Sequence, residues 1–339
     1  MLEINGDYLE GGGQILRTAV SLSCILQKPV RIFNIRAKRK EPGLKSQHLY
    51  TLKVLAELFD AETQGLNLGS KEVYFSPKLE FISQNYKEVD LKTAGSIGLA
   101  LQALVLVSAF KSKGIVFKIR GGSCGLGAIP VDYYPEVVFP ILRRSGLEAE
   151  IEIKRRGYYP KGGGEVEVKI QGLVESKPIF LDEAGEVKEI KIISIASLDL
   201  KKRNVAERQL YIAKDLLKRY FNFSFNTKIE YAHTDSSGSE LNIVAYTDKG
   251  AILWSDARGE LKKTAEEVAK EAVDKLIKEI DAGSAVDTHL ADNLISWLSF
   301  LGGRIKTGHL SLHTQTNIWV CEKFLGKIFL VKDNYIQKI

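Results

Sequence analysis

Three consecutive glycines at the start of a predicted helix are the first feature of this sequence that could do chemistry. Glu10 precedes Gly11-Gly12-Gly13, and an apolar, helix-periodic segment follows from Ile15. Glycines let the backbone approach a ligand closely, and the N–H groups of a helix N-terminus favour an anion. Because no Gly-Lys-Ser or Gly-Lys-Thr follows, a P-loop is disfavoured. The loop is predicted to bind phosphate, with Glu10 beside it for a divalent cation. The alternative is a glycine turn next to a surface glutamate.

A strongly basic segment comes next along the chain. Residues 28–45 contain seven Lys and Arg and a single acid, Glu41. Arg36 and Arg39 are close enough in sequence to converge on one oligophosphate, because a guanidinium grips phosphate through two parallel hydrogen bonds. Gln47 and His48 would face the same pocket from the first turn of a helix. A polyanionic partner is therefore plausible, and a solvated basic surface is the alternative.

His309 and His313 stand four residues apart, a spacing that invites comparison with a zinc site. The glutamate of a His-Glu-x-x-His motif is absent, and the alternation of residues 309–313 is typical of a strand, so zinc binding is disfavoured. We instead expect His313 to stand just before a helix that begins at residue 316. The positive end of that helix would keep the imidazole neutral, hence nucleophilic, and would accept a phosphoryl group. A capping or core histidine is the alternative.

A fourth polar group, in the segment from His289 to Asn293, opens the preceding helix. Asp292 and Asn293 are able to hydrogen-bond the sugar or base of a nucleotide, and equally able to cap the helix. Spacing alone leaves both interpretations open.

The elements that must position these residues follow a repeated βαβαββ pattern. The first copy is expected as a short N-terminal strand, helix 13–27, strand 30–35, helix 47–59 and strands 63–68 and 72–75. The second is expected as a strand near residue 89, helix 96–110, strand 115–119, helix 132–144 and strands 149–153 and 165–170. The third is visible only in its later part, as helix 291–301, strand 304–306, helix 316–325 and strands 327–331 and 335–339.

An interruption separates the third copy from the second. Its expected elements are strand 187–194, helix 206–220, strands 227–232, 241–245 and 251–255, and helix 262–280. This stretch is long enough to bury its own core. We therefore predict an α+β protein in which three βαβαββ repeats form a large domain, residues 1–184 and 283–339. A smaller α+β domain, residues 185–282, is inserted into the third repeat.

Composition narrows the class of protein further. The 339 residues are 45% apolar and 27% charged with a net charge of +6, as in an ordinary globular protein and unlike a disordered chain. The three cysteines lie far apart without a Cys-x-x-Cys pair, which excludes a disulfide framework and a Cys-rich zinc site. The most apolar stretch, residues 97–110, is too short to span a bilayer. We expect a cytoplasmic protein with no membrane partner.

Taken in order, these motifs resemble the RNA 3'-terminal phosphate cyclase family over essentially the whole chain. The segments that carry the resemblance are EGGGQILR at 10–17, IRAKRKEPGLKSQHL at 35–49, AGSIGLALQ at 94–102, GYYPKGGG at 157–164, NVAER at 204–208, HLADN at 289–293 and HTQTNI at 313–318. The family's fold implies three βαβαββ repeats plus an inserted domain. Its activity implies the ATP-dependent conversion of an RNA 3'-phosphate end into a 2',3'-cyclic phosphodiester through a covalent adenylyl-histidine.

The resemblance also implies roles for individual residues. By similarity His313 is the nucleophile, and Glu10 binds a divalent metal, Mg²⁺ or Mn²⁺. Phosphates of ATP or of the RNA end would be held by Gln14, Arg17, Arg36 and Arg39, with Gln47 and His48 beside the RNA end. The residues that would contact ATP are Gln102, His289, Leu290, Ala291, Asp292 and Asn293, with Pro130 flanking the adenine. The implied partners are ATP and RNA with a 3'-phosphate end, and a homodimer is an oligomeric state that the sequence leaves open.

Two departures from the family pattern and two rival functions remain. Asn293 stands where the family often has Gln, and Gly121-Gly122-Ser123-Cys124-Gly125 replaces a Gly-Gly-Thr-Asp-like stretch, so no role is assigned to Ser123 or Cys124. One rival is a non-catalytic RNA-binding relative that acts in ribosome maturation and lacks the histidine nucleophile. The other is a three-carbon-unit transferase on a shared repeat fold, which would lack the HTQTN segment.

Overall fold

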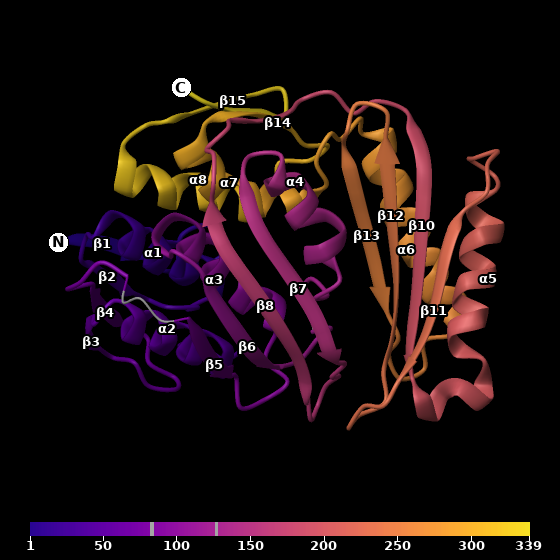
Figure 1. The fold of residues 1–339 in the computed structure, drawn as a ribbon, viewed down its shortest axis with the longest axis horizontal. Coiled ribbons are helices and arrows are strands. Elements are labelled where there is room, and N and C mark those ends of the chain that lie inside the picture. Colours follow the sequence, from indigo (N-terminus) through magenta and orange to yellow (C-terminus); the bar gives the residue numbers. More distant parts are fainter. Residues whose placement is uncertain (82–84, 126–127) are drawn as a thin grey trace.

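The computed structural model describes residues 1–81, 85–125 and 128–339. Within these residues helices and strands are interspersed, and the strands form four separate four-stranded sheets (Figure 1). The prediction of an α+β protein is confirmed. Three of the sheets share one strand order, and the fourth is built differently.

The first sheet gathers the N-terminal strands in the order β1-β2-β4-β3. The strand β1 pairs in parallel with β2, and the other pairs are antiparallel. Its elements are β1 (Leu2–Asn5), α1 (Gly13–Leu26), β2 (Val30–Phe33), α2 (Ser46–Leu58), β3 (Glu62–Gln64) and β4 (Val73–Ser76). A parallel pair needs a crossover, and α1 provides it.

The second and third sheets repeat this order, as β5-β6-β8-β7 and β9-β14-β16-β15, again with a parallel first pair. The elements around the second sheet are β5 (Tyr86–Asp90), α3 (Ile97–Lys111), β6 (Ile115–Gly121), the π-helical turn η1 (Tyr134–Val138), α4 (Phe139–Arg143), β7 (Leu147–Arg155) and β8 (Gly164–Leu173). Those around the third are β9 (Ile179–Leu181), α7 (Thr288–Leu301), β14 (Gly303–Lys306), α8 (Leu312–Leu325), β15 (Phe329–Lys332) and β16 (Tyr335–Lys338).

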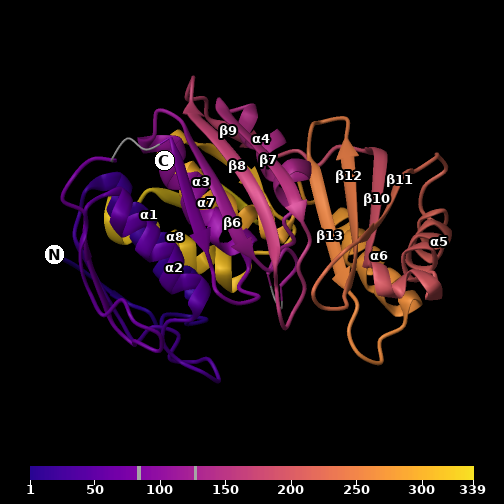
Figure 2. The same ribbon diagram turned by 60° about the horizontal axis from the view of Figure 1, so that its bottom comes forward.

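The fourth sheet belongs to residues 187–281, called here the 187–281 segment, which lies between β9 and α7 in the chain. Its strand order is β11-β10-β12-β13, with one parallel pair, β10 and β11. The elements are β10 (Val187–Ser197), the 3₁₀ turn η2 (Leu198–Arg203), α5 (Val205–Leu217), β11 (Asn226–Ala232), β12 (Ser239–Thr247), β13 (Ile252–Arg258) and α6 (Ala265–Asp281). Figures 1 and 2 both show this sheet on the side of the molecule away from α1 and α2, with α5 outermost.

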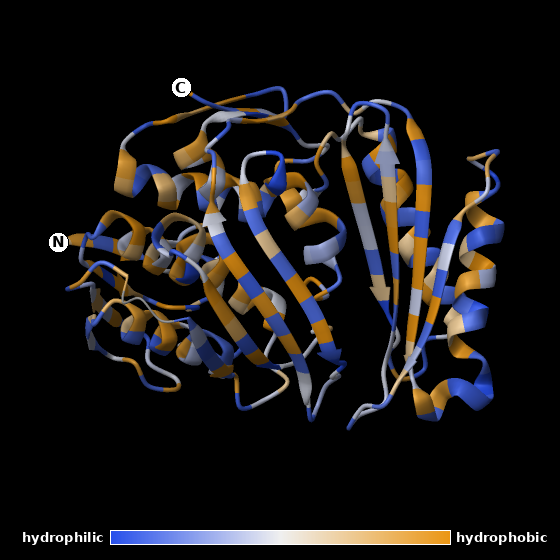
Figure 3. Cartoon of the chain, in the orientation of Figure 1, coloured by the Kyte–Doolittle hydropathy of each residue, from blue (hydrophilic) through white to orange (hydrophobic). Residues whose placement is uncertain are grey.

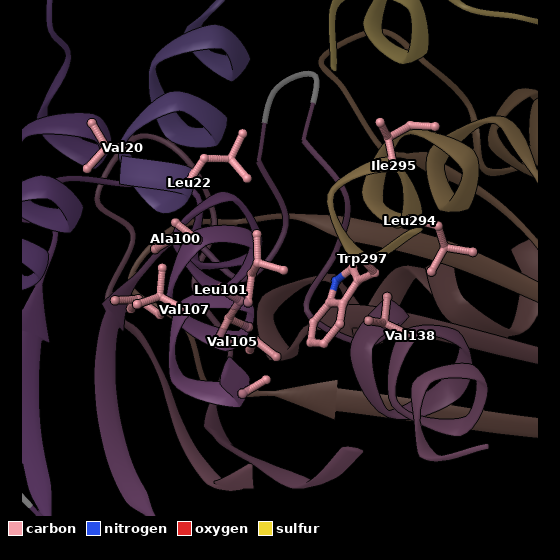
Figure 4. Packing of buried hydrophobic residues seen from close by; sticks show 14 of the residues in the cluster. Val20, Leu22, Ala100, Leu101, Val105, Val107, Val138, Leu294, Ile295 and Trp297 are labelled. Atoms are coloured by element: carbon pink, nitrogen blue, oxygen red, sulfur yellow. The ribbon is translucent and has the colours of Figure 1, made fainter. Parts of the chain in front are cut away.

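Two hydrophobic cores correspond to this division. In the larger core, α3 is buried on almost every side, as expected for a helix that is apolar nearly all round. Helix α1 is buried as well, although it carries polar side chains such as Gln14 and Arg17. Figure 4 shows Leu101 and Val105 of α3 beside Trp297 of α7. A second core lies between the fourth sheet and its helices α5 and α6. The opposite face of that sheet contributes Val244 and Trp254 to the larger core, so the two parts of the molecule pack directly together.

Strands β7 and β8 show why one face of the second sheet is covered. Apolar and polar residues alternate along both strands, which Figure 3 makes visible as alternating bands. One face of β8 packs against α3, and the polar face is directed away from the core. The sheet thereby fixes the position of the loop that joins β7 to β8.

Several expected elements differ from the observed ones at their ends, and the expected helix 132–144 is the turn η1 followed by the short helix α4. One difference in boundaries matters for the site. The segment from His309 to His313 is not a strand, because α8 begins at Leu312 rather than at residue 316. The Ser311 side chain accepts a hydrogen bond from Thr314 N at 2.9 Å and so caps the helix four residues earlier than expected. His313 therefore lies inside the first turn of α8.

Candidate active site

A cavity of about 1060 Å³ lies where the N-terminal ends of α1, α2 and α8 meet α7 and the loops of the second sheet. Its volume is at the upper end for a small-molecule site, so it has room for a nucleotide and more. Most of its polar lining comes from the predicted motifs. The lining residues are Glu10, Gly13, Gln14, Arg17, Arg36, Arg39, Lys45, Gln47, His48, Thr93, Ala94, Gly95, Leu99, Gln102, Ala128, Ile129, Tyr159, Pro160, His289, Asp292, Asn293 and His313.

His313 reaches this cavity from the first turn of α8, and its side chain is 43% exposed. Its Nδ1 lies 2.9 Å from Glu10 Oε2, and Gln14 Nε2 donates to the His313 carbonyl oxygen at 3.0 Å. An Nδ1–H that donates to the carboxylate leaves the lone pair of a neutral imidazole on Nε2. The arrangement therefore suits a nucleophile that attacks through Nε2.

Asp292 holds the helix that carries His313. Its Oδ1 accepts hydrogen bonds from Ser311 Oγ at 2.6 Å and Thr314 Oγ1 at 2.5 Å, and its carbonyl oxygen accepts one from Asn317 Nδ2 at 2.7 Å. Burial raises the pKa of the Asp292 carboxyl, against the effect of the two hydroxyl donors. The side chain lines the cavity, and its bonds are to α8, so it positions the start of that helix.

Arg17 lies at the floor of the cavity with only 8% of its surface exposed. Its Nη2 donates to Gln102 Oε1 at 3.0 Å, and its Nε is buried without a hydrogen-bond partner among the described residues. Burial lowers the pKa of the guanidinium to about 10, which leaves it charged at neutral pH. Since a buried charge is costly unless paired, this cation is suited to an anionic ligand.

The predicted pair of arginines is also brought to the cavity. Arg39 forms an ion pair with Glu10, whose other carboxylate oxygen faces His313. Arg36 donates through Nη1 to the carbonyl oxygens of Glu41 at 2.7 Å and Gly43 at 2.9 Å. Burial, and then repulsion from Arg39, lowers the pKa of Arg36. Both guanidiniums keep donors for an anion.

His48 and Gln47 come from the first turn of α2, as predicted. His48 is buried, and desolvation, followed by repulsion from Arg17, Arg36 and Lys45, lowers its pKa well below 6.5. The ring is therefore neutral. Gly13 is required beside it, because a β-carbon there would lie within 2.7 Å of His48 Cε1.

Gln47 links α2 to the next helix of the site. Its Oε1 accepts a hydrogen bond from Ser96 N at 2.9 Å, at the N-cap of α3. The N-terminus of α1 differs from that of α3, because its N-cap is Gly12, which has no side chain to cap it. The first N–H groups of α1 are thus available to a phosphate.

Three of the predicted contacts are not brought to the cavity. Leu290 and Ala291 are fully buried in the larger core, since α7 turns these two positions inward and His289, Asp292 and Asn293 toward the cavity. Pro130 is buried as well, and Ala128 and Ile129 take the wall position expected for it. The side chains of Leu290, Ala291 and Pro130 therefore bring no surface to a ligand in this structure.

Other lining residues carried no predicted role. Lys45 adds a cation beside the two arginines, Thr93 lies in the turn before α3, and Tyr159 with Pro160 stands on the loop between β7 and β8. This loop contains the GYYPKGGG segment, which carried part of the family resemblance but was given no role of its own.

Glu10 is the predicted metal ligand of this site, and it lines the cavity. The described residues contain no group of three or more His, Cys, Asp and Glu that would hold an ion without further ligands. Glu10 alone still fits Mg²⁺, since this ion takes one or two carboxylates and completes its shell with phosphate oxygens and water. In the part of the chain that the structure describes, no helix is both long and apolar enough to cross a membrane.

Comparison with known proteins gives a consistent result. The sequence pattern of the family described as RNA 3'-terminal phosphate cyclase matches residues 8–331. Three similar proteins carry that same name. The one from Thermococcus onnurineus is 42% identical over 332 residues, covering 98% of this chain and 96% of the relative. The one from Pyrococcus furiosus is 40% identical over 338 residues, covering 100% and 97%. The one from Methanopyrus kandleri is 38% identical over 332 residues, covering 96% and 93%.

Proposed function

Because this chain belongs to the RNA 3'-terminal phosphate cyclase family, we propose that it is an ATP-dependent enzyme that converts the 3'-terminal phosphate of RNA into a 2',3'-cyclic phosphodiester. The reaction would pass through AMP bound covalently to His313 and then through an RNA-adenylate. The observation that carries this proposal is the His313 imidazole, half-exposed over the cavity and oriented by Glu10 at 2.9 Å.

Three displacements make up the proposed reaction. His313 Nε2 attacks the α-phosphorus of ATP, a P–N bond forms, and the P–O bond to pyrophosphate breaks. An oxygen of the RNA 3'-phosphate then attacks the same phosphorus, so AMP moves to the RNA and His313 regains its lone pair. Finally the neighbouring 2'-hydroxyl attacks the 3'-phosphorus, loses its proton and expels AMP. Adenylation supplies a good leaving group, and the adjacent hydroxyl supplies proximity.

The side chains around His313 would bind two different sets of phosphates, those of ATP and that of the RNA end. We assign Arg17, with Gln102 and Gln14, to the phosphates of ATP, because Arg17 is buried without a carboxylate partner among the described residues. Arg36, Arg39, Gln47 and His48 would hold the RNA 3'-phosphate. Glu10 would hold a divalent cation when one is bound, and its positive charge would offset that of the phosphates.

We further propose that the molecule is a large domain of three βαβαββ repeats, residues 1–184 and 283–339, with a second domain, 185–282, inserted into the third repeat. The common strand order of three sheets and the separate core of the 187–281 segment support this division. Limited proteolysis in the loops that border residue 185 and residue 283, followed by mass spectrometry, tests it.

The test of the function is covalent labelling. The purified protein is incubated with ATP labelled on the α-phosphate and a divalent metal, then denatured. Acid-labile, alkali-stable label is expected, as for a phosphoramidate. His313→Ala should lower it by at least about 1000-fold, because the bond-forming atom is lost. His309→Ala is the matched control, an exposed histidine four residues away that lies outside the cavity lining, and it should label normally.

Two outcomes would change the assignment. Equal labelling of His313→Ala and His309→Ala would show that His313 is not the nucleophile. If the protein takes no label with any metal, the result would favour the non-catalytic RNA-binding relative described in the sequence analysis. The basic segment 28–45 would then be the feature to study.

A further inference from the structure

Two neighbouring tyrosines in the loop between β7 and β8 have opposite environments. Tyr158 is 4% exposed, and its hydroxyl donates to Glu240 Oε1 at 3.2 Å. Tyr159 is 66% exposed and is one of the residues that line the cavity that contains His313. An exposed tyrosine alone needs no explanation, but one on the wall of a polar cavity offers an aromatic face to whatever enters.

The backbone beneath Tyr159 is held on several sides. Gly162 N donates to the Tyr158 carbonyl oxygen at 2.8 Å, which closes the turn. On one side, Ser123 N donates to the Gly157 carbonyl oxygen at 2.9 Å. On the other, Lys161 N donates to Ser236 Oγ at 3.1 Å, in the loop between β11 and β12. A ring on such a fixed turn is ordered before a ligand binds, so less entropy is lost on binding.

The 187–281 segment provides much of this support. Its loop 233–238 lies beside the β7–β8 loop, and the two are seen together at the lower edge of Figure 1. Arg155 at the end of β7 forms an ion pair with Asp235 at 2.6 Å. Tyr158 is anchored to Glu240 of β12. The segment therefore acts on the cavity through the turn that carries Tyr159.

The turn also places Tyr159 on the side of the cavity that holds Gln47. A β-carbon at Gly162 would lie 2.8 Å from Ala94 Cα, so the turn packs closely on residues 93–95. In the same way, a β-carbon at Gly95 would lie 3.1 Å from Gln47 Cβ. Gln47 belongs to the group assigned above to the RNA 3'-phosphate. If the RNA 3'-phosphate binds there, the base of the same terminal nucleotide would come within reach of Tyr159.

We propose that Tyr159 is a stacking platform for the base of the 3'-terminal nucleotide of RNA, and this inference rests on the proposed function. Single-stranded RNA ends are recognised by stacking of unpaired bases on aromatic side chains. Stacking tolerates every base, because each has a π-face, so it suits an enzyme that acts on ends of varied sequence. The platform would fix the ribose beyond the base and so orient its 2'-hydroxyl.

Equilibrium binding of a labelled oligonucleotide with a 3'-phosphate, without ATP, tests the platform. Tyr159→Ala should raise the Kd about tenfold, and Tyr159→Phe, which keeps the ring, should stay within about twofold of the wild type. Tyr211→Ala is the matched control, because Tyr211 is 72% exposed on α5 outside the cavity lining. It should leave the Kd unchanged.

A second oligonucleotide, identical but with an abasic 3'-terminal nucleotide, isolates the base. Wild-type protein should bind it about tenfold more weakly than the intact oligonucleotide, whereas Tyr159→Ala should bind both almost equally. If wild type and Tyr159→Ala lose the same factor when the base is removed, the ring does not contact that base and the proposal is wrong. If Tyr159→Ala instead raises the ATP concentration needed for half-maximal labelling of His313, the ring belongs to the nucleotide pocket and the proposal is also wrong.

These readouts keep the two proposals apart. Suppose that the wild-type protein takes no label from ATP, but binds the abasic oligonucleotide more weakly than the intact one, and that this difference disappears in Tyr159→Ala. The stacking proposal would then stand and the proposed catalytic function would be wrong. If His313 is labelled normally, but wild type and Tyr159→Ala lose the same affinity when the base is removed, the proposed function would stand and the stacking proposal would be wrong.

Discussion

Arg17 and Arg156 are both buried arginines, but the side chains that surround them differ. Arg17 is 8% exposed and donates to one neutral partner, Gln102. Arg156 is 4% exposed and lies among three carboxylates. It binds Asp132 through two nitrogens and Glu230 at 2.9 Å, and its Nη1 lies 3.9 Å from Glu240.

The partners of the two arginines distinguish a binding site from a structural junction, a distinction that residue type alone does not make. The junction, as named here, is Arg156 with Asp132, Glu230 and Glu240. Arg156 joins the large body of the molecule to β11 and β12 of the 187–281 segment, and its charge is neutralised within the protein. Arg17 faces a cavity, and no salt bridge to an Asp or Glu of the described residues neutralises it. A buried cation without an internal counter-ion is the mark of a site whose anion comes from outside.

One arginine cannot neutralise three carboxylates, so the carboxyl groups of the junction differ in their pKa values. Burial opposes the charge on Glu230, but the hydrogen bond and attraction of Arg156 outweigh it and lower the pKa to about 2. Glu240 is fully buried, and burial together with repulsion from Asp132 raises its pKa to about 8. At neutral pH the junction therefore contains ionised Glu230 and mostly protonated Glu240.

The largest expected effect comes from removing the cation of the junction. Arg156→Met should lower the free energy of unfolding by about 3–5 kcal/mol, because it leaves buried carboxylates without their partner. Denaturant unfolding at pH 8 and pH 5 measures this, and the loss should be smaller at pH 5, where the carboxyl groups protonate more easily. Arg208→Met, which breaks an exposed ion pair with Glu266, is the control and should cost under about 1 kcal/mol.

The junction interpretation can also fail in a specific way. An Arg156→Met protein as stable as the wild type would mean that the three carboxylates tolerate one another without it. A variant that folds normally and loses labelling of His313 would place Arg156 in the catalytic site, and the distinction drawn from its partners would collapse.

Removing the cation of the cavity should have the opposite consequences. Arg17→Met should unfold with a free energy equal to or above that of the wild type, since a buried charge without a counter-ion is removed. The ATP concentration that gives half-maximal labelling of His313 should rise about 100-fold, or about 2.7 kcal/mol. A clear loss of stability with unchanged use of ATP would make Arg17 a structural residue like Arg156.

Local patterns were sufficient to predict most elements and the motifs that meet at the cavity. Helix α1 was expected to end at residue 27 and ends at Leu26, because its apolar periodicity stops there. The glycine loop, the two arginines and His313 were identified from residue types that bind phosphate or attack it. Leu290 and Ala291 were expected at the site because the family resemblance covers the whole segment 289–293, but a helix turns adjacent residues to different faces and these two are buried in the core.

The parts that the sequence did not reveal depend on distant partners. Arg156 and Glu230 are 74 positions apart, so nothing local indicates that they pair. The hydrogen bonds of Tyr158 and Lys161 also reach across to the 187–281 segment, and they determine why Tyr159 rather than Tyr158 faces the cavity. The early start of α8 was missed because the capping strength of Ser311 was outweighed by a strand-like alternation.

The smallest expected effect tests the protonation of the junction. Because the pKa of Glu240 is higher in the folded protein, at about 8, than its usual 4.5, the folded state binds the proton more tightly. The resulting stability is fully present below about pH 4.5 and is lost as pH rises through 8. Glu240→Gln keeps a neutral side chain, so it should remove about 2 kcal/mol of the decline in unfolding free energy between about pH 6.5 and pH 9.

Asp287 provides the internal control for that slope. Burial raises its pKa to about 7 from the usual 3.8, so its own contribution is lost by about pH 7, earlier than that of Glu240. Asp287→Asn should therefore flatten the decline of stability mainly below pH 7, while Glu240→Gln flattens it up to pH 8. If Glu240→Gln leaves the slope above pH 7 as steep as in the wild type, Glu240 is ionised in the folded protein. Arg156 would then face one more ionised carboxylate, and the junction would carry more negative charge, which would widen its electrostatic difference from the cavity around Arg17.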